Sequence, residues 1–245
     1  MQGVFFIAAC ASVLAVALIC IFLFANGIPA MKEIGFGNFL SGKMWKPKNE
    51  IFGILPMIVG SLYVTAGAII FGVPIGILTA VFMAYYCPKK IYKPLKAATE
   101  LLAGIPSVVY GFFGLVVIVP LIRTIGRDLG FGGNGSSILT ASLLLGMMIL
   151  PTIIGLTESS IRAVPPHYYE GAVALGATHE RAIFRVVIPA AKSGVIAAIV
   201  LGVGRAIGET MAVIMVAGNQ ARMPAGIFRG VRTLTANVVI EMGYA

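Results

Sequence analysis

Two ionisable side chains lie inside a long, largely apolar run near the C-terminal end of the chain. Arg205 and Glu209 are four residues apart in the run from Ala190 to about Ala217. In a helix this spacing places both side chains on one face, and Arg205 about 22 Å along the run, near the middle of a bilayer. A charge at that depth costs about 2.5–3.5 kcal/mol, so the pair must face a partner or a wet cavity. Two interpretations stay open: an ion pair that neutralises itself, or a binding site for a ligand.

The residues around this pair favour an anionic ligand. Gly202, Gly204 and Gly208 are small enough to let another helix or a ligand approach the backbone. A guanidinium group presents a planar fork of donors that suits a tetrahedral oxyanion. Thr210 adds a hydroxyl group beside Glu209. We therefore take Arg205, Glu209 and Thr210 as a candidate translocation site for an oxyanion.

Other kinds of chemistry find no support in the sequence. Residues 37–43 have the spacing of a phosphate-binding loop, but Met44 stands where Ser or Thr must hold Mg²⁺. His179 has no second histidine four positions on, and the chain contains two histidines in all, so we expect no metal site and no cofactor. An intramembrane enzyme would need a nucleophile and a base at one depth, and Glu209 and Thr210 lack a histidine. We expect the chain not to be an enzyme.

The composition indicates a membrane protein. Lys and Arg number 18 against 9 Asp and Glu, a net charge of +9, yet 11% of residues are charged and 59% are hydrophobic. Soluble domains carry about 25% charged residues. The apolar runs between the charges are also too long for a soluble nucleic-acid binder. The three cysteines lie in apolar runs and predict no disulfide framework.

Five apolar runs are long enough to cross a bilayer, which takes about 20 residues per helix. They predict an all-α, polytopic membrane helical bundle with five spans: Val4–Ala25, Pro56–Cys87, about Ala97–Ile122, Ser137 to about Thr157, and Ala190 to about Ala217. The turn residues Asn26, Gly27 and Pro29 are expected to end the first helix. We expect residues 123–136 and the chain after Ala217 to be loops. Two domains are predicted, 1–55 with an N-terminal helix and an extracytoplasmic loop, and 56–245.

The longest polar segment, 158–192, has helical periodicity in two pieces. Tyr168, Ala172 and Leu175 follow one another at spacings of four and three, and a second periodic piece lies after residue 180. Gly176 stands between the pieces. Two short amphipathic helices that meet at a glycine fit this pattern.

This segment resembles the EAA loop of ABC transporter permeases. Residues 170–189 read E-G-A-V-A-L-G-A-T-H-E-R-A-I-F-R-V-V-I-P. Glu170, Ala172, Gly176 and Pro189 match the family pattern, and Gly171, Val186 and Ile188 are mild departures. The resemblance implies a coupling loop on which a cytoplasmic ATPase subunit docks. Its candidate residues are Glu170, Gly171, Ala172, Gly176, Ile188 and Pro189.

Two further stretches are similar to signature segments of the phosphate-specific permeases. They read GIPSVVYGFFGL at 104–115 and GRAIGETMAVIMVAGN at 204–219, the latter closer to the C-type subunit than to its A-type paralogue. The resemblance implies a type I ABC importer transmembrane domain that forms half of a pathway for inorganic phosphate, with Arg205 and Glu209 matching the charged pair associated with phosphate movement. The implied partners are an A-type permease subunit, an ATP-binding subunit dimer, an extracytoplasmic phosphate-binding protein and the lipid bilayer, with no nucleic acid. Such permeases have one more C-terminal helix, which this sequence is expected to lack.

The orientation rests mainly on this resemblance. Lys and Arg are nearly balanced between the two sides, eight against nine, although the lysine cluster at 89–96 favours its own side as cytoplasmic. A cytoplasmic coupling loop places the N-terminus in the cytoplasm of a bacterium or archaeon. Arg222, Arg229 and Arg232 then lie outside, either as an anion-attracting vestibule or as interfacial side chains that snorkel.

The resemblance leaves three rivals. A permease for molybdate or sulfate would use similar donors, and the A-type phosphate paralogue shares the same motifs. A stand-alone secondary transporter or channel could use an Arg–Glu pair, but it has no reason to carry a docking loop.

Overall fold

The computed structural model describes residues 1–243 of the chain, which divide into two compact units, residues 1–55 and a unit that begins at Pro56. The first unit contains α1 (Gln2–Ile34), α2 (Phe36–Ser41), β1 (Trp45–Lys46), the 3₁₀-helix η1 (Pro47–Asn49) and β2 (Ile51–Phe52). The two strands pair antiparallel, with Trp45 opposite Phe52 and their rings 5.6 Å apart.

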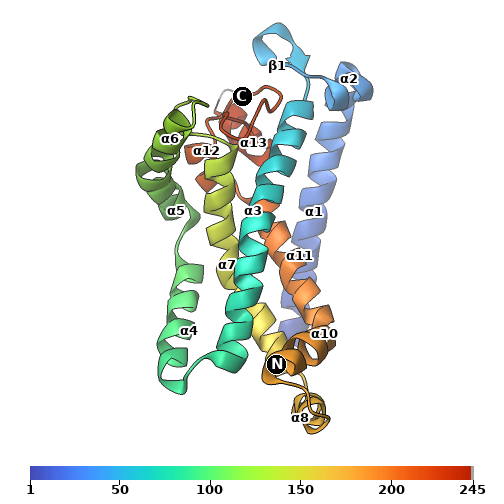
Figure 1. Ribbon diagram of the computed structural model, residues 1–245. Helices are drawn as coiled ribbons and strands as arrows, with labels where there is room; N and C mark the ends of the chain where they lie inside the picture. Colours follow the sequence, from blue (N-terminus) through green and yellow to red (C-terminus); the bar gives the residue numbers. More distant parts are fainter. Residues whose placement is uncertain (244–245) are drawn as a thin grey trace. The chain divides into compact units, whose positions relative to one another are not determined.

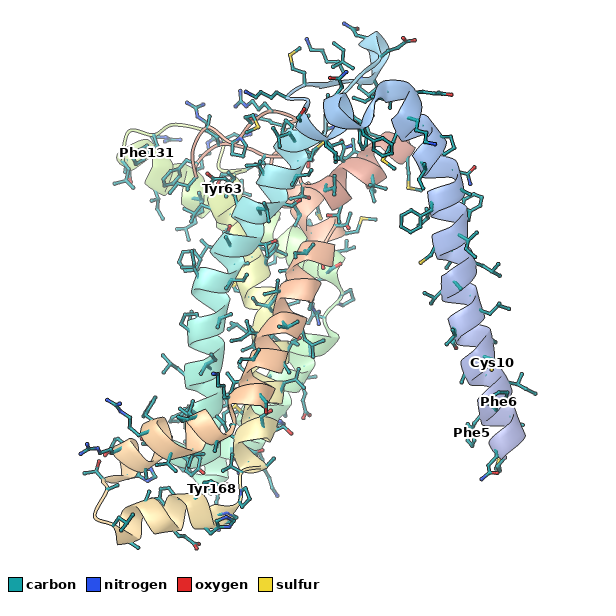
Figure 2. All side chains as sticks on the ribbon, turned by 90° about the vertical axis from the view of Figure 1, so that its right-hand side faces the viewer. Phe5, Phe6, Cys10, Tyr63, Phe131 and Tyr168 are labelled. Atoms are coloured by element: carbon teal, nitrogen blue, oxygen red, sulfur yellow. The ribbon has the colours of Figure 1, made fainter. Side chains whose placement is uncertain are left out.

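Helix α1 continues well beyond the predicted end. Asn26, Gly27 and Pro29 lie inside it, and the side-chain amide of Asn26 donates to the carbonyl of Phe22 at 2.8 Å. The expectation that these residues end the helix is wrong, because a chain in hydrocarbon has no water to satisfy a broken backbone. No residue of α1 is buried, and Figure 2 labels Phe5, Phe6 and Cys10 near its start.

The second unit is helical. It begins with α3 (Leu55–Val81), whose start overlaps the first unit by one residue, and the π-helix η2 (Phe82–Tyr86). Then come α4 (Lys89–Gly104), α5 (Ser107–Phe113), the π-helix η3 (Gly114–Ile118), α6 (Val119–Asp128) and α7 (Ile138–Arg162). The remaining elements are α8 (Pro166–Ala174), α9 (His179–Ala182), the π-helix η4 (Ile183–Val187), α10 (Ile188–Ala190), α11 (Lys192–Gly208), α12 (Met211–Val216) and α13 (Leu234–Met242).

The predicted all-α, multi-pass bundle is confirmed. Within residues 1–243, four helices are long and apolar enough to cross a membrane: Gln2–Ile34, Leu55–Tyr86, Ser107–Asp128 and Ile138–Arg162. A fifth span is counted if the pair His179–Ala190 and Lys192–Gly208, bent by 70°, is taken as one.

Helix α7 forms the centre of the second unit. Leu144, Ile149 and Ile153 are fully buried on it, and α3 and α11 pack against it through small residues. Figure 1 shows α8 and α10 at one end of this unit, near the start of α4, and α6, α12 and α13 at the other.

Several predicted boundaries are wrong. The third span begins at Ser107 and reaches Asp128, so residues 123–128 are helical, and α13 covers part of the chain expected to be a loop after Ala217. Helix α4 stops at Gly104 because Ile105, which precedes Pro106, is extended with φ −70° and ψ 127°. Glu158 belongs to α7, so the polar segment begins after Arg162. We call residues 163–191 the interhelix segment.

Candidate functional site

The chain around the charged pair is not one continuous helix. Helix α11 ends at Gly208, and Glu209 is extended with φ −71° and ψ 129°. The carboxylate Oε1 of Glu209 accepts hydrogen bonds from the backbone amides of Thr210 at 3.2 Å and Ala212 at 3.3 Å. The expectation that Arg205 and Glu209 share one helical face is therefore wrong, because Glu209 lies outside α11, in the extended link between α11 and α12.

Arg205 has no acidic partner. Across residues 1–243 it takes part in no ion pair, and its side chain is exposed on α11. Helix α11 leaves the same side of its surface open at Leu201 and Gly208. The interpretation as a self-neutralising ion pair with Glu209 is thus not supported, and the guanidinium group is available to a ligand.

The surroundings of Glu209 are polar but closely packed. The hydroxyl of Thr235 donates to the carbonyl of Glu209 at 3.1 Å, and the hydroxyl of Thr210 donates to that of Gly208 at 3.2 Å. A cavity of about 10 Å³ beside Glu209 is also lined by Ser61 and Thr65. This volume holds about one water molecule. An oxyanion does not fit there, so among the described residues of this site the open side of Arg205 is the part that can receive one.

The three candidate vestibule arginines differ in their surroundings. Arg222 and Arg229 are exposed in the loop between α12 and α13. Arg232 pairs with Glu241 at 2.9 Å and also donates to the backbone carbonyl of Asn219 at 3.1 Å. Two of the three are therefore free to attract an anion, while Arg232 holds the loop against α13. Phe131, labelled at the same end in Figure 2, stacks on Phe228 of this loop with ring centroids 5.0 Å apart.

The interhelix segment has the predicted form, two short helical pieces that meet at a glycine. Gly176 lies between α8 and α9 with φ 86°, a left-handed conformation that favours glycine. Leu175 beside it is 92% exposed. The two pieces enclose a groove of about 330 Å³ with Arg181 and Arg185 on one side. Such a surface suits docking, with an apolar knob and charged groups at its rim.

The other candidate coupling residues are distributed over this segment. Glu170, Gly171 and Ala172 lie on α8, while Ile188 and Pro189 lie on α10. Helix α11, 17 residues long, separates the segment from Arg205 by about 20 Å at 1.5 Å per residue. The two candidate sites are thus at different levels of the same unit, and the label of Tyr168 in Figure 2 marks the end with the segment.

Aromatic and apolar contacts hold the segment against the rest of the unit. The hydroxyl of Tyr169 lies 2.8 Å from Nδ1 of His179, which links α8 to α9. The rings of Tyr85 and Tyr86, from η2, lie 6.3 and 5.0 Å from the imidazole. Ile183 of η4 is fully buried in a cluster with residues of α3 and α7.

A buried carboxylate nearby escaped the sequence analysis. Glu158, in the last turn but one of α7, is 1% exposed and accepts hydrogen bonds from Tyr92 at 2.7 Å, Lys96 at 2.9 Å and Arg162 at 2.8 Å. We call these four residues the Glu158 cluster. The hydrogen bond to Glu158 raises the pKa of Lys96 above its ordinary value. The only signal in the sequence was the four-residue spacing from Glu158 to Arg162, which gives no hint of Tyr92 or Lys96.

The comparisons with known proteins agree with this architecture. Residues 72–243 match the family described as the inner membrane component of binding-protein-dependent transport systems. The chain belongs to this family. The matched range includes α7, the interhelix segment and α11, so both candidate sites lie within the family's shared region.

Individual relatives of this transport family cover most of the chain. The phosphate transport system permease protein PstC of Mesorhizobium japonicum is 37% identical over 91% of this chain and 72% of its own length. The probable ABC transporter permease protein YqgH of Bacillus subtilis is 38% identical over 99% of this chain and 79% of its own length. PstC of Haemophilus influenzae is 33% identical over 94% of this chain and 77% of its own length. Permease subunits are transport components rather than enzymes.

A solved structure supports the fold. An inward-facing structure of the MetNI methionine ABC transporter gives a TM-score of 0.55 at 20% identity, over 81% of this chain and 90% of that chain. At this identity the likeness shows a common fold. The protein is thus a multi-pass membrane protein with the fold of an ABC importer transmembrane domain.

Proposed function

We propose that this chain is the C-type permease subunit of an ATP-driven phosphate importer and forms half of the pathway that takes inorganic phosphate into the cell. The observation that carries the proposal is the exposed Arg205, which has no acidic partner within residues 1–243 and lies on α11, part of the bent helix pair that can be counted as a fifth span. Relatives named as phosphate transport permeases, 33–37% identical over most of the chain, support phosphate as the anion.

The chemistry of Arg205 suits a phosphate dianion. Its fork of N–H donors can bind two oxygens of one phosphate group, and its positive charge offsets part of the cost of removing the anion from water. Glu209 is held by backbone amides 3.2 and 3.3 Å away, so its negative charge is partly neutralised there. Glu209 then shapes the end of α11 instead of pairing with Arg205. The hydroxyl of Thr210, which donates to the carbonyl of Gly208, would have to leave that carbonyl to donate to phosphate.

The second half of the site comes from a partner. Within the described part of the second unit the open side of Arg205 has no covering element, and the cavity beside Glu209 is too small for phosphate. An A-type permease subunit would close this side as a heterodimer, and the two subunits would alternate access by rocking about the site. Arg222 and Arg229 would attract phosphate delivered by an extracytoplasmic binding protein.

ATP hydrolysis would act on this chain through the interhelix segment. An ATP-binding subunit dimer in the cytoplasm would dock on Leu175 and the groove beside Gly176, with Glu170 at the rim, and would carry out ATP hydrolysis. This arrangement places both the segment and the N-terminus in the cytoplasm of a bacterial or archaeal cell.

Uptake by an assembled transporter tests the proposal. Proteoliposomes with the chain, its permease partner, the ATPase and the binding protein should take up radiolabelled phosphate when ATP is inside. Arg205→Gln keeps a polar side chain but removes its charge, which should lower uptake at least tenfold, since a hydrogen bond to a charged group contributes about 1.5–3 kcal/mol. Arg127→Gln, at the exposed end of α6, is the matched control, with less than a threefold loss expected. Normal uptake by Arg205→Gln would show that Arg205 does not bind the transported phosphate.

The rival is another oxyanion. Molybdate and sulfate offer similar oxygens, and competition separates them from phosphate. If phosphate is the substrate, unlabelled molybdate or sulfate should fail to compete at concentrations where unlabelled phosphate abolishes uptake. If either anion competes as strongly as phosphate does, that anion would be the proposed substrate in place of phosphate.

A further inference from the structure

Helix α4 is attached to the rest of its unit in an unusual way. None of its residues is buried, so little apolar packing holds it in place. Figure 1 shows it beside α7, at the end of the unit where the interhelix segment lies. Within residues 1–243, three side-chain hydrogen bonds attach it to other helices. Tyr92 and Lys96 donate to the buried Glu158, and the carbonyl of Leu102 accepts from the hydroxyl of Tyr110 at 2.9 Å.

The other side of the Glu158 cluster faces the interhelix segment. Arg162 donates to Glu158 and also to the carbonyl of Met83 at 2.9 Å, so it connects the end of α7 to η2. The segment packs on these same two elements, through Tyr85 with Tyr169, whose ring centroids lie 5.8 Å apart, and through the buried cluster around Ile183. Glu158 therefore lies between the interhelix segment and α4.

The far end of α4 continues toward the candidate transport site. Only Ile105 and Pro106 separate α4 from α5. Helix α5 packs closely on α12, where a side-chain carbon on Gly111 would lie 3.0 Å from Cα of Ala212. The amide of that same Ala212 donates to Glu209. A displacement of α4 along its axis would thus be transmitted through α5 and α12 to Glu209, which follows the end of α11.

We infer that Glu158 is a positioning residue for transport, which fixes α4 to the end of α7 so that a movement of the interhelix segment reaches α5 and the Glu209 region. The inference rests on the proposed function, since it deepens how ATP hydrolysis would act on the same pathway. A carboxylate suits this role because three charge-assisted hydrogen bonds fix position and direction, whereas an apolar contact allows sliding. A residue that served stability alone would affect all activities together.

The first test compares transport with ATP hydrolysis in the assembled transporter. Glu158→Gln and, as a second variant, Lys96→Met should each lower the phosphate moved per ATP hydrolysed at least fivefold, while ATP hydrolysis stays within twofold of the unaltered complex. Lys96→Arg keeps the charge and should restore the ratio to within twofold. Lys93→Met, on an exposed turn of the same helix, is the matched control with no change expected. An unchanged ratio in both variants, or an equal fall of transport and hydrolysis, would overturn the inference.

The second test does not depend on which anion is transported. Spin labels on cysteines placed at Lys93 of α4 and Glu180 of α9, after Cys10, Cys20 and Cys87 are changed to serine, report the distance between the two elements in the assembled complex. Nucleotide binding should leave a single narrow distance distribution when Glu158 is present, and Glu158→Gln should broaden it. An equally narrow distribution in the variant would overturn the inference. Absence of phosphate uptake by the unaltered complex would instead overturn the proposed function alone.

Discussion

At the scale of single residues, the main role of Glu209 is to stabilise the backbone rather than to contact a ligand. Its carboxylate satisfies two amides at the start of α12, groups that a short helix in a membrane cannot leave unpaired. The charge of Arg205 is left uncompensated as a result. The end of α11 at Gly208 thus gives Arg205 and Glu209 different roles, although they are only four residues apart.

This division of tasks predicts different outcomes for two substitutions of Glu209. Glu209→Gln keeps a side-chain oxygen for the amides, so phosphate uptake should stay within about threefold of the unaltered complex. Glu209→Ala removes the acceptor, which costs about 0.5–2 kcal/mol for a lost helix cap. We expect that variant to lose uptake more than tenfold and to melt earlier in detergent. If Gln proves as harmful as Ala, the charge of Glu209 matters more than its hydrogen bonds.

The residue-level prediction from sequence was right about the place and wrong about the geometry. The depth of Arg205 follows from its position in an apolar run. Whether α11 continues past Gly208 depends on the backbone of Glu209, and no local rule marks Glu209 as a helix end. Glu158 was missed for a different reason: its partners Tyr92 and Lys96 precede it by 66 and 62 residues, so its burial is a tertiary property.

At the scale of elements, the bundle depends on close approach of helices through small residues. A side-chain carbon on Gly72 of α3 would lie 2.7 Å from Ile149 and 2.9 Å from the carbonyl oxygen of Gly146, both on α7. Since helices in a bilayer gain little from hydrophobic burial against one another, such packing supplies much of their association.

Gly72→Ala should therefore separate α3 from α7. Overpacking of a tight core costs about 1–3 kcal/mol. We expect a lower midpoint of unfolding in detergent and reduced yield of the assembled complex. Gly155→Ala is the matched control, because a side-chain carbon on Gly155 of α7 would meet no atom within 4 Å. Equal stability of the two variants would show that α3 can shift to make room.

The same level explains which helix boundaries could be predicted. Long apolar runs gave the spans of α3 and α7 nearly to their ends, and Gly176 marked the bend of the interhelix segment. The third span was misplaced because apolar content continues from α4 into α5, while the break comes from the backbone restriction before Pro106. In α1 the predicted end came too early, since Asn26 and Pro29 usually end helices in water but are tolerated within helices in hydrocarbon.

At the scale of the whole molecule, the proposed function makes the chain one part of an assembly. In that proposal a second permease subunit covers the exposed side of Arg205, and a subunit that binds ATP covers the exposed Leu175 and Glu170. The family and the crossing helices followed from sequence alone. Which partner covers which surface depends on contacts that one chain does not contain, and the cytoplasmic position of the N-terminus stays a prediction.

Docking of the ATPase can be tested by charge. Glu170→Lys reverses the charge at the rim of the interhelix segment and should reduce retention of the ATPase subunit on affinity-purified complex at least fivefold. Retention should recover in part at high salt, where repulsion between exposed charges is screened. Glu241→Lys is unsuitable as a control because it breaks the pair with Arg232, so Glu33→Lys in the first unit serves instead. Undiminished retention in Glu170→Lys would exclude Glu170 from the docking surface.

The position of the Glu158 cluster along the chain has a consequence for biosynthesis. Chains are made from the N-terminus, and α4 is complete before α7 leaves the ribosome. Tyr92 and Lys96 are thus already in place when Glu158 reaches the membrane, and Arg162 follows four residues later. A carboxylate that would be costly to bury alone therefore finds one of its two cations, Lys96, already made. A circular permutant that places α4 after α7 would leave Glu158 with Arg162 alone until α4 is made, and insertion of α7 should become the slow step of its assembly.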